Sequence, residues 1–245
     1  MWISEYFWIA GLASFLVGLS KGGLPTVGML AVPMLSLQMP PMTAATLLLP
    51  IFVISDGVAV YLYRHQFSAE NLKRLLPAGL FGVTVGWLLA ASVSDALFSL
   101  LIGLTGIGFC LNMWMRRTPK PTQTPSRWGG YLWGTLAGLT SFISHSGAPP
   151  FQIYTLPQRL PKLVFAGTST LFFAVINAAK IYPYQNLRPY SEDVLMQATG
   201  LVPFAVLGTL VGAWATRKIH DKWFFLLVQI TLFGVSVKLV MGALA

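Results

Sequence analysis

Cysteine is almost missing from this sequence, with Cys110 alone among 245 residues. A disulfide within the chain is therefore excluded, and so is a metal cluster held by several cysteines. The sequence also lacks the His-Glu-x-x-His motif of zinc hydrolases and the Gly-x4-Gly-Lys-Ser/Thr loop that holds nucleotide phosphates. We expect no metal site, no cofactor and no ATP-driven motor.

Charged residues are scarce as well. They make up 9% of the chain, whereas a soluble domain usually has about 25%. Hydrophobic residues make up 55%, which indicates a membrane protein built from spans of about 20 residues. The 16 basic residues outnumber the 7 acidic ones. Two explanations of this excess are basic cytoplasmic loops and attraction of an anionic solute, and both can hold. Nucleic-acid binding is not expected, because the basic residues form no long stripe.

The apolar residues form ten segments in two sets of five. The first set comprises 4–20, 26–39, 42–62, 74–92 and 95–115, and the second comprises 129–144, 148–158, 163–182, 194–215 and 222–243. A polar, proline-rich stretch separates the sets. We therefore expect an all-α, polytopic integral membrane protein, with a first transmembrane repeat over 1–115, a cytoplasmic linker over 116–128 and a second transmembrane repeat over 129–245.

One motif occurs twice, at an offset of 124 residues. Ser20-Lys-Gly-Gly-Leu-Pro25 in the first set returns as Ser144-His-Ser-Gly-Ala-Pro149 in the second. Each copy places small, polar and helix-breaking residues inside an apolar region. Unwound backbone at membrane depth is tolerated only where it is buried in protein or lines a cavity. Breaks at corresponding places of two halves indicate the binding site of a transporter.

Glycines spaced four residues apart are also duplicated. Gly82 and Gly86 correspond to Gly208 and Gly212 at an offset of 126. Small residues at this spacing let helix backbones approach closely. We therefore expect these glycines at helix contacts and not in a binding site.

The basic residues indicate how the segments are oriented. If five segments alternate sides in each repeat, the loops at 64–74, 116–127, 159–162 and 217–222 share one face and hold 12 of the 16 basic residues. The positive-inside rule makes that face cytoplasmic. Both termini then lie outside, and the two repeats are inverted. An even number of spans per repeat would instead give parallel repeats and scatter the same charges over both faces.

The first two segments of each repeat are short, and a Gly/Pro break separates them. They form either two full spans or one re-entrant hairpin, so the total is eight to ten segments, and the alternation is the same in both cases. Inversion would bring one hairpin in from each side of the membrane. Their tips would then meet near the midplane.

These motifs resemble those of the sulfite exporter TauE/SafE family. The resemblance covers essentially the whole chain and rests on the segments Gly18–Pro25, Val32-Pro33, Thr43–Thr46, Ser144–Pro150, Leu156–Gln158 and Gly167–Thr170. Many members carry a longer glycine run than this chain has at its two breaks. The resemblance implies a cytoplasmic-membrane carrier for small sulfur-containing or organic anions.

Four ionisable residues fall inside the expected segments: Lys21, Asp56, His145 and Lys180. Such residues are costly in a membrane and indicate a functional site. At the offset of 124, Lys21 corresponds to His145 and Asp56 corresponds to Lys180. Equivalent places in the two repeats therefore carry unequal charges.

An anion requires a positive charge, unpaired N–H groups and space. Lys21 can supply the charge, glycines permit close backbone approach, and His145 can bind the anion or carry a coupling proton. Helices that begin after the breaks would point their positive dipole ends at the anion. A snorkelling Lys21 and a neutral His145 bonded to a hairpin carbonyl stay open as alternatives. The expected substrate-binding residues are Lys21, Gly22, Gly23, His145, Ser146, Gly147, Gln152 and Asn177.

Coupling or gating is expected to involve Asp56, Lys180 and His145. Asp56 and Lys180 can exchange partners during transport, or they can pair and simply hold the third segments of the two repeats together. Aromatic residues at the ends of those segments are typical interfacial anchors. These residues are Tyr61, Tyr63, Tyr182 and Tyr184.

The leading hypothesis is a secondary transporter, and not an enzyme, that exports a small anion such as sulfite or a sulfonate by alternating access. It would lie in the cytoplasmic (inner) membrane as a multi-pass protein, with the anion, membrane lipid and protons as partners, and a homo-oligomer stays open. One alternative is a membrane scaffold or assembly factor. A weaker one is an intramembrane hydrolase that uses His145 beside Ser144 and Ser146. Lys21 replaces that histidine in the other copy, so the repeated feature is a broken backbone and not a triad.

Overall fold

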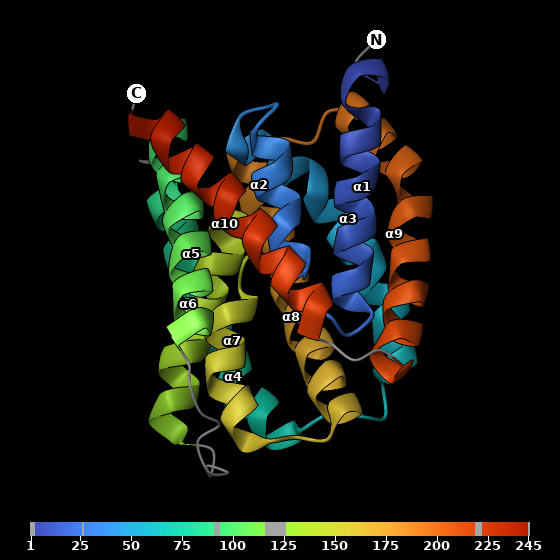
Figure 1. Cartoon of the computed structure of the whole chain (residues 1–245), viewed down its shortest axis with the longest axis vertical. Coiled ribbons are helices and arrows are strands. Elements are labelled where there is room, and N and C mark those ends of the chain that lie inside the picture. The colour runs from blue at the N-terminus through green and yellow to red at the C-terminus, as the bar shows by residue number, and fades with distance from the viewer. Residues whose placement is uncertain (1–2, 26, 91–93, 116–125, 219–221, 245) are drawn as a thin grey trace.

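The computed structural model describes residues 3–25, 27–90, 94–115, 126–218 and 222–244 (Figure 1). Over these ranges the chain is helical and has no strand, which confirms the expected fold class. The helices are α1 (Ile3–Lys21), η1 (Val27–Leu30), α2 (Ala31–Ser36), α3 (Pro41–Tyr63), α4 (Ala69–Ala90), α5 (Asp95–Met115), α6 (Arg127–Ser144), α7 (Ala148–Thr155), η2 (Leu156–Gln158), α8 (Lys162–Leu187), α9 (Glu192–Lys218) and α10 (Lys222–Leu244).

The expected linker falls mostly outside the described residues, because nothing is described over 116–125. Its last residues belong to the next helix, since α6 begins at Arg127. Ser126 caps this helix by accepting a hydrogen bond from the Gly129 N–H at 3.3 Å. The division into two repeats stays a prediction.

Helix length separates full spans from half spans. Among the described residues, four helices are long and apolar enough to cross a membrane: α3, α4, α8 and α9. α1 has 19 residues and is therefore about 28 Å long. Two stretches are much shorter, namely η1 with α2 and α7 with η2. Each is only about 17 Å long. This is little more than half the thickness of a hydrocarbon core of about 30 Å. A full-length helix followed by a half-length helix fits a re-entrant hairpin better than two full spans.

The two breaks have different local causes. At the first break, Gly23 has a φ of 112°, which glycine adopts without strain. At the second, α6 ends on His145 with a φ of 52°, in the left-handed region where glycine or asparagine is usual. Pro149 and Pro150 then lie in the first turn of α7, where a missing N–H leaves no helical hydrogen bond unmade. A histidine at a strained C-cap indicates a role beyond ending the helix.

Helices of one half of the chain pack on helices of the other half, in a reciprocal pattern (Figure 1). α1 packs on α9, and the corresponding helix α6 packs on α4. α3 packs on α8 and α9, whereas α8 packs on α3 and α4. α5 and α10, which also correspond, pack on each other. This exchange is what two copies related by an approximate two-fold axis produce.

Helix ends and loops that the alternating topology places on one side of the membrane lie at one end of the molecule. α1 begins and α10 ends toward the same end of the molecule, at the top of Figure 1. The loop between α3 and α4 and the turn before α8 lie at the opposite end. The first of these also contacts α8 near this end, because the Ser68 N–H donates to Thr168 Oγ1 at 2.9 Å. Two of the loops expected to be cytoplasmic therefore share one face.

The duplicated glycines lie at helix contacts, as expected. A Cβ added to Gly82 would lie 2.0 Å from a backbone oxygen of α6, and one added to Gly208 would lie 2.2 Å from a backbone oxygen of α1. A Cβ added to Gly86 would lie 2.9 Å from the Phe142 side chain of α6, and one added to Gly212 would lie 2.6 Å from the Leu19 carbonyl oxygen of α1. Each pair lets two backbones approach more closely than any side chain would allow.

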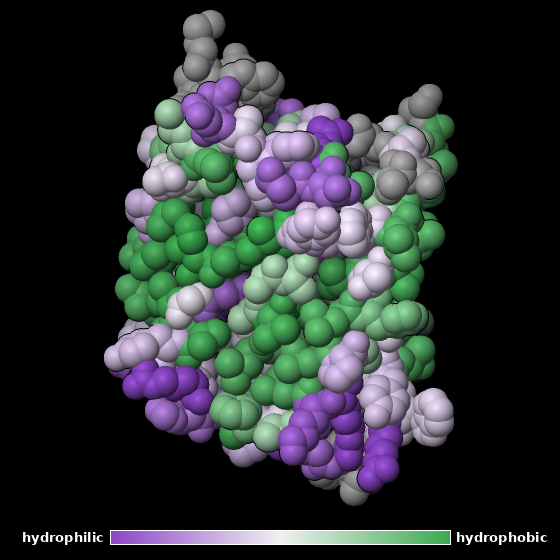
Figure 2. Space-filling model, turned by 180° about the vertical axis from the view of Figure 1, so that it is seen from behind, coloured by the Kyte–Doolittle hydropathy of each residue, from purple (hydrophilic) through white to green (hydrophobic). Residues whose placement is uncertain are grey.

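The surface carries an apolar belt. Figure 2 shows hydrophobic residues across the middle of the visible face and hydrophilic residues at both ends. Large apolar side chains are exposed on several helices, among them Trp8, Phe81, Leu88 and Trp214. In water such a surface would favour aggregation, whereas lipid tails solvate it. The belt fits a protein that crosses a membrane several times.

The α4–α6 contact predicts a stability effect. A Cβ at position 138 would lie 1.9 Å from the Gly79 carbonyl oxygen, so Gly138→Ala is expected to push the two helices apart. Overpacking of this kind costs about 1–3 kcal/mol, which is measurable as a lower Tm in detergent. Gly108→Ala is the matched control, because position 108 is exposed and has open space around it. Equal Tm values for the two variants would contradict the close contact.

Candidate functional site

The four ionisable residues that the sequence singled out meet in the interior. Lys21 at the end of α1 is 5% exposed, Asp56 in α3 is 3% exposed, and His145 at the end of α6 is 8% exposed. Lys180 in α8 is completely buried. Burying a charge is costly unless partners satisfy it, so the contacts among these residues decide the chemistry of the site.

Lys21 and Asp56 form a buried ion pair. Lys21 Nζ lies 2.7 Å from Asp56 Oδ1. The other carboxylate oxygen, Oδ2, accepts a hydrogen bond from the Asn177 side-chain amide at 2.7 Å. The pairing differs from the Asp56–Lys180 pair that we considered from the sequence. The end of α1 brings Lys21 to the carboxylate, and Lys180 finds other partners.

Lys180 points at the second break. Its ammonium nitrogen lies 3.0 Å from the Ser141 carbonyl oxygen, 3.1 Å from Ser141 Oγ and 2.6 Å from His145 Nδ1. Three acceptors match the three N–H donors of an ammonium group. This buried lysine is therefore satisfied without a carboxylate, and it shares the Ser141 carbonyl with the His145 N–H, which donates to the same oxygen at 3.0 Å.

His145 is held on both ring nitrogens and on both ring faces. Nε2 lies 3.0 Å from the carbonyl oxygen of Ala45 in α3, while Nδ1 faces Lys180. The ring lies between Phe52 and Tyr184, with centroids 4.5 Å and 5.8 Å away. A carbonyl oxygen can only accept, so Nε2 carries a hydrogen. The carbonyl belongs to α3 and not to the hairpin.

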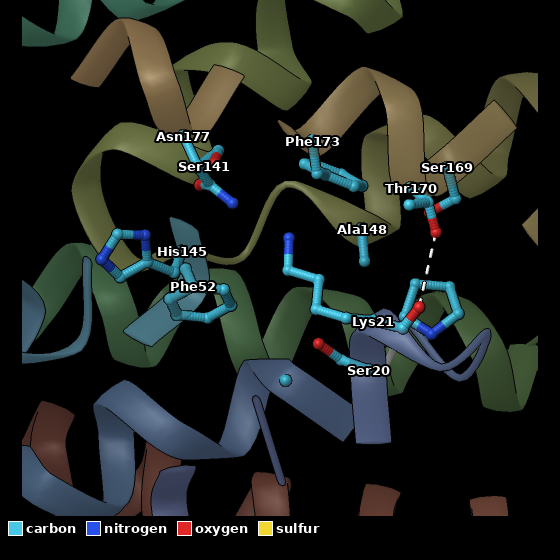
Figure 3. A pocket seen from close by; sticks show the side chains of 12 residues that line it. Ser20, Lys21, Phe52, Ser141, His145, Ala148, Ser169, Thr170, Phe173 and Asn177 are labelled. Atoms are coloured by element: carbon cyan, nitrogen blue, oxygen red, sulfur yellow. Dashed lines mark hydrogen bonds between the residues drawn. The ribbon is translucent and has the colours of Figure 1, made fainter. Parts of the chain in front are cut away.

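A small cavity lies beside the ion pair (Figure 3). Its volume is about 20 Å³. A cavity needs about 10–15 Å³ to hold one water molecule, so this one has room for one or two waters and not for an oxyanion. The lining comes from both breaks and from the third helix of each half, through Ser20, Lys21, Pro25, Gly28, Phe52, Ser141, His145, Ala148, Ser169, Thr170, Phe173 and Asn177.

The structure brings together only some of the expected binding residues. Lys21, His145 and Asn177 line the cavity. Asp56 and Lys180 do not line it but contact residues that do. The remaining expected binding residues lie outside the lining: Gly22, Gly23, Ser146, Gly147 and Gln152.

The glycines at the breaks serve packing between helices. A Cβ on Gly22 would lie 2.5 Å from a backbone nitrogen of α9, and one on Gly147 would lie 2.5 Å from a backbone oxygen of α6. A Cβ on Gly23 would lie 2.7 Å from the Thr216 hydroxyl of α9. These positions allow the broken chain to press against neighbouring helices.

Two of the four tyrosines expected at the membrane interface are buried instead. Tyr63 donates to the Gly22 carbonyl at 2.7 Å, and Tyr184 donates to the Phe142 carbonyl at 2.6 Å. Both side chains are at most 1% exposed, whereas Tyr61 and Tyr182 are largely exposed. The interfacial prediction was wrong for the buried pair. A broken helix leaves carbonyls without partners, and these hydroxyls satisfy them.

Two aromatic residues and one serine of the cavity lining, Phe52, Phe173 and Ser141, were missed in the sequence. Phe52 precedes Asp56 by four residues, and Phe173 precedes Asn177 by four. Ser141 precedes His145 by the same interval, and residues four apart share a helix face. A spacing of four residues from Asp56, His145 and Asn177, all expected site residues, would therefore have found all three.

No serine at the breaks is arranged as a nucleophile. Ser144 and Ser146 donate to the carbonyls of Thr140 and Ser144, and the His145 ring is engaged elsewhere. The segment Gly18-Leu-Ser20-Lys-Gly22 fits the Gly-x-Ser-x-Gly motif of serine hydrolases. In those enzymes the motif forms a sharp turn, the nucleophile elbow, between a strand and a helix. Ser20 lies instead in the last turn of α1 and donates to a carbonyl of its own helix at 2.7 Å.

Comparison with known families identifies the chain. The family model described as "Sulfite exporter TauE/SafE" matches residues 10–239, nearly the whole sequence. The chain belongs to this family. TauE/SafE proteins are membrane transporters of the sulfite and sulfonate exporter type and are not enzymes, so the resemblance and the non-enzymatic prediction are confirmed. Comparisons of this TauE/SafE protein with curated proteins and with solved structures find no match.

The buried ion pair predicts non-additive stability. Asp56→Leu leaves Lys21 charged and buried without its carboxylate, and breaking such a pair costs about 3–5 kcal/mol. Lys21→Met combined with Asp56→Leu removes both charges and is expected to recover most of the lost Tm in detergent. Glu70→Ala, which removes an exposed ion pair with Arg74, should change Tm little. A double variant as unstable as Asp56→Leu alone would contradict the pairing.

Proposed function

We propose that this TauE/SafE protein is a secondary carrier that exports a small sulfur-containing or organic anion across the cytoplasmic membrane. The observation that carries the proposal is a cavity lined by both helix breaks, with one buried lysine in its wall and a second behind it. Burying a positive charge in the interior of a membrane protein costs free energy. An anionic ligand gives a reason for its presence.

The lining offers an anion the groups it needs. The Lys21 ammonium points into the cavity between the rings of Phe52 and Phe173, at 5.1 Å and 5.6 Å from their centroids (Figure 3). Hydroxyls and an amide surround it, from Ser20, Ser141, Ser169, Thr170 and Asn177. α7 begins at Ala148 in the cavity wall, which directs the positive end of a helix dipole toward the ligand. The aromatic rings would suit the carbon part of a sulfonate.

Transport by alternating access would require the cavity to open, because it is too small for an oxyanion. Polar contacts join the halves on both sides of it. At one end, the Asn71 amide donates to Gln158 Oε1 at 2.8 Å, and at the other, Arg188 donates to Thr43 Oγ1 at 2.7 Å. We infer that rocking of two inverted repeats breaks these contacts in turn.

The anion would compete with Asp56 for Lys21 when it binds. Asp56, Lys180 and His145 are then the groups that couple binding to movement, with protons as the proposed coupling ion. A membrane potential that is negative inside favours anion export by about 2.3 kcal/mol per charge per 100 mV. Uptake would need a co-transported cation, so export is the direction we propose.

A scaffold or assembly factor is the second candidate from the sequence. It gains no support from the interior, because holding partners together does not require ionisable residues at two helix breaks. Surface residues would suffice for that role. The buried charges favour the carrier.

Lys21→Ala is expected to abolish anion binding and to lower Tm, because Asp56 loses its ion-pair partner. Binding is therefore measured at a temperature at which circular dichroism shows the variant to be folded. Among the described residues that line the cavity, Lys21 is the one that carries an ammonium group, and the variant removes it. A screen of sulfite, thiosulfate, sulfonates and short carboxylates with the purified protein, followed by flux in proteoliposomes, measures the loss. Lys73→Ala is the matched control, since Lys73 is exposed on α4. Unchanged flux in Lys21→Ala would remove Lys21 from the site.

The proposed topology is tested by cysteine labelling in intact cells. Cys110 is buried, so background labelling should be low. His65→Cys, in the loop between α3 and α4, is expected to be protected from an impermeant reagent, because that loop is proposed to be cytoplasmic. Ser191→Cys, before α9, is expected to label. Both positions are exposed in the structure, so ready labelling of His65→Cys from outside would overturn the orientation.

A further inference from the structure

A second cavity lies between α1, α3 and α9, at the end of the molecule where α1 begins (Figure 1). Its volume is about 70 Å³, more than three times that of the cavity beside the ion pair, and the two share no lining residue. Its walls include Phe7, Leu47 and Leu201, and apart from Tyr6 and Gln197 the lining residues are apolar. Cavities with apolar walls stay dry and take up apolar ligands. This one therefore suits a hydrocarbon chain better than an oxyanion.

The second cavity opens at the depth of lipid chains. Met196 lines it and is 68% exposed, and Gly200 in the lining is exposed too. α9 has 27 residues and is about 40 Å long, so centring it on a hydrocarbon core of about 30 Å leaves about 5 Å outside at each end. Gly200 lies about 12 Å from the start of α9 and is therefore inside the core. The opening is continuous with the apolar belt that lipid tails solvate.

The corresponding place in the other half of the chain is filled by a side chain. At the offset of 124, Tyr6 corresponds to Gly130 of α6, and Leu30 corresponds to Tyr154 of α7. A Cβ on Gly130 would lie 3.0 Å from a side chain of α4 and 3.1 Å from the Tyr154 hydroxyl. Leu30 packs instead in another core cluster and does not line the second cavity. The chain thus fills this space with a tyrosine in one half and leaves it open in the other.

Two acidic residues lie one helical turn beyond the opening. Glu192 and Asp193 precede the lining residues Met196 and Gln197 by four positions, so each shares a face of α9 with one of them. Both acidic side chains are exposed in the first turn of the helix. That turn is the part of α9 that extends beyond the hydrocarbon core. The carboxylates are therefore at the level of lipid headgroups.

A basic residue lies at the same level on the α3 side. The Arg188 guanidinium donates to Thr43 Oγ1 at 2.7 Å, and Thr43 precedes the lining residue Leu47 by four positions on α3. The opening is thus bordered by one positive and two negative side chains. A headgroup with a phosphate and an ammonium group complements this set, whereas an anionic headgroup meets an excess of negative charge.

We propose that the second cavity binds one acyl chain of a phospholipid whose headgroup carries a primary ammonium group. The chain takes the place that Tyr154 takes in the other half, and it supports α1 against α9. The ammonium group pairs with Glu192 and Asp193, and the phosphate lies beside Arg188. The second cavity is separate from the cavity at the ion pair, so the inference does not depend on the proposed function.

Phosphatidylethanolamine and phosphatidylglycerol with identical acyl chains test the proposal, because only the first carries an ammonium group. Their Kd values would be measured by native mass spectrometry of the purified protein in detergent. One phosphatidylethanolamine is expected to bind at least about tenfold more tightly than phosphatidylglycerol and to raise Tm as its concentration rises. Glycerophosphoethanolamine has the same headgroup and no chains, and it is expected not to compete.

A variant that fills the second cavity tests the place of the chain. Gly200 lines the cavity, and a Cβ there would have open space around it. Gly200→Phe is therefore expected to weaken phosphatidylethanolamine binding by at least about tenfold without lowering the Tm of the lipid-free protein. Gly234→Phe is the matched control, because Gly234 is an exposed glycine of α10 with open space as well, and it should leave the Kd unchanged.

A second variant tests the headgroup. Glu192→Gln combined with Asp193→Asn removes both carboxylates, so the preference for phosphatidylethanolamine over phosphatidylglycerol should fall by at least about tenfold. Glu70→Gln, at an exposed acidic residue in the first turn of α4, should leave that preference unchanged.

Three results would overturn the inference. Equal Kd values for the two lipids with the wild-type protein would remove the headgroup preference. An unchanged Kd in folded Gly200→Phe would remove the chain from the second cavity. Competition by glycerophosphoethanolamine at the Kd of the intact lipid would show that the chain adds nothing, and this measurement decides the question even if Gly200→Phe does not fold.

Discussion

The ion pair between Lys21 and Asp56 is the interaction on which the rest of the site depends. Lys21 ends a helix and is enclosed by other helices, so its charge is largely shielded from bulk water and a carboxylate stabilises it. This pairing fixes the end of α1 against the middle of α3. Asn177 of α8 holds the second carboxylate oxygen and so brings the opposite half of the chain to the same point. Three helices from the two halves of the chain are thereby joined beside the cavity.

The two breaks solve one problem with different residues. Each leaves carbonyl groups that a continuous helix would have used, and each recruits a hydroxyl from a tyrosine, Tyr63 at the first break and Tyr184 at the second. The second break adds Lys180, which donates to the carbonyl of Ser141. The first break places its own lysine in the cavity instead. Breaks at corresponding places of the two halves thus carry unequal charges.

The glycines at the two breaks serve close packing between helices. Gly22, Gly23 and Gly147 allow the broken segments to press against α9 and α6, where any Cβ would collide with a neighbouring helix. The breaks are therefore clamped by long helices and are not free to relax. Movement of those helices would move the breaks with them. This is the mechanical link that alternating access at a midplane site needs.

The sequence by itself determined the membrane class, the helical fold, the doubled break and the four ionisable residues, because composition, period and duplication are local properties of the chain. It also indicated the contacts of Gly82 and Gly208, since spacing alone places small residues on one helix face. The tertiary structure decided which charges pair. Lys21, Lys180 and His145 could each have met Asp56, and only the relative placement of α1, α3, α6 and α8 gives the carboxylate to Lys21 and the ring to Lys180. Which charged side chains pair depends on the distances between segments that are far apart in the sequence. No local sequence pattern specifies those distances.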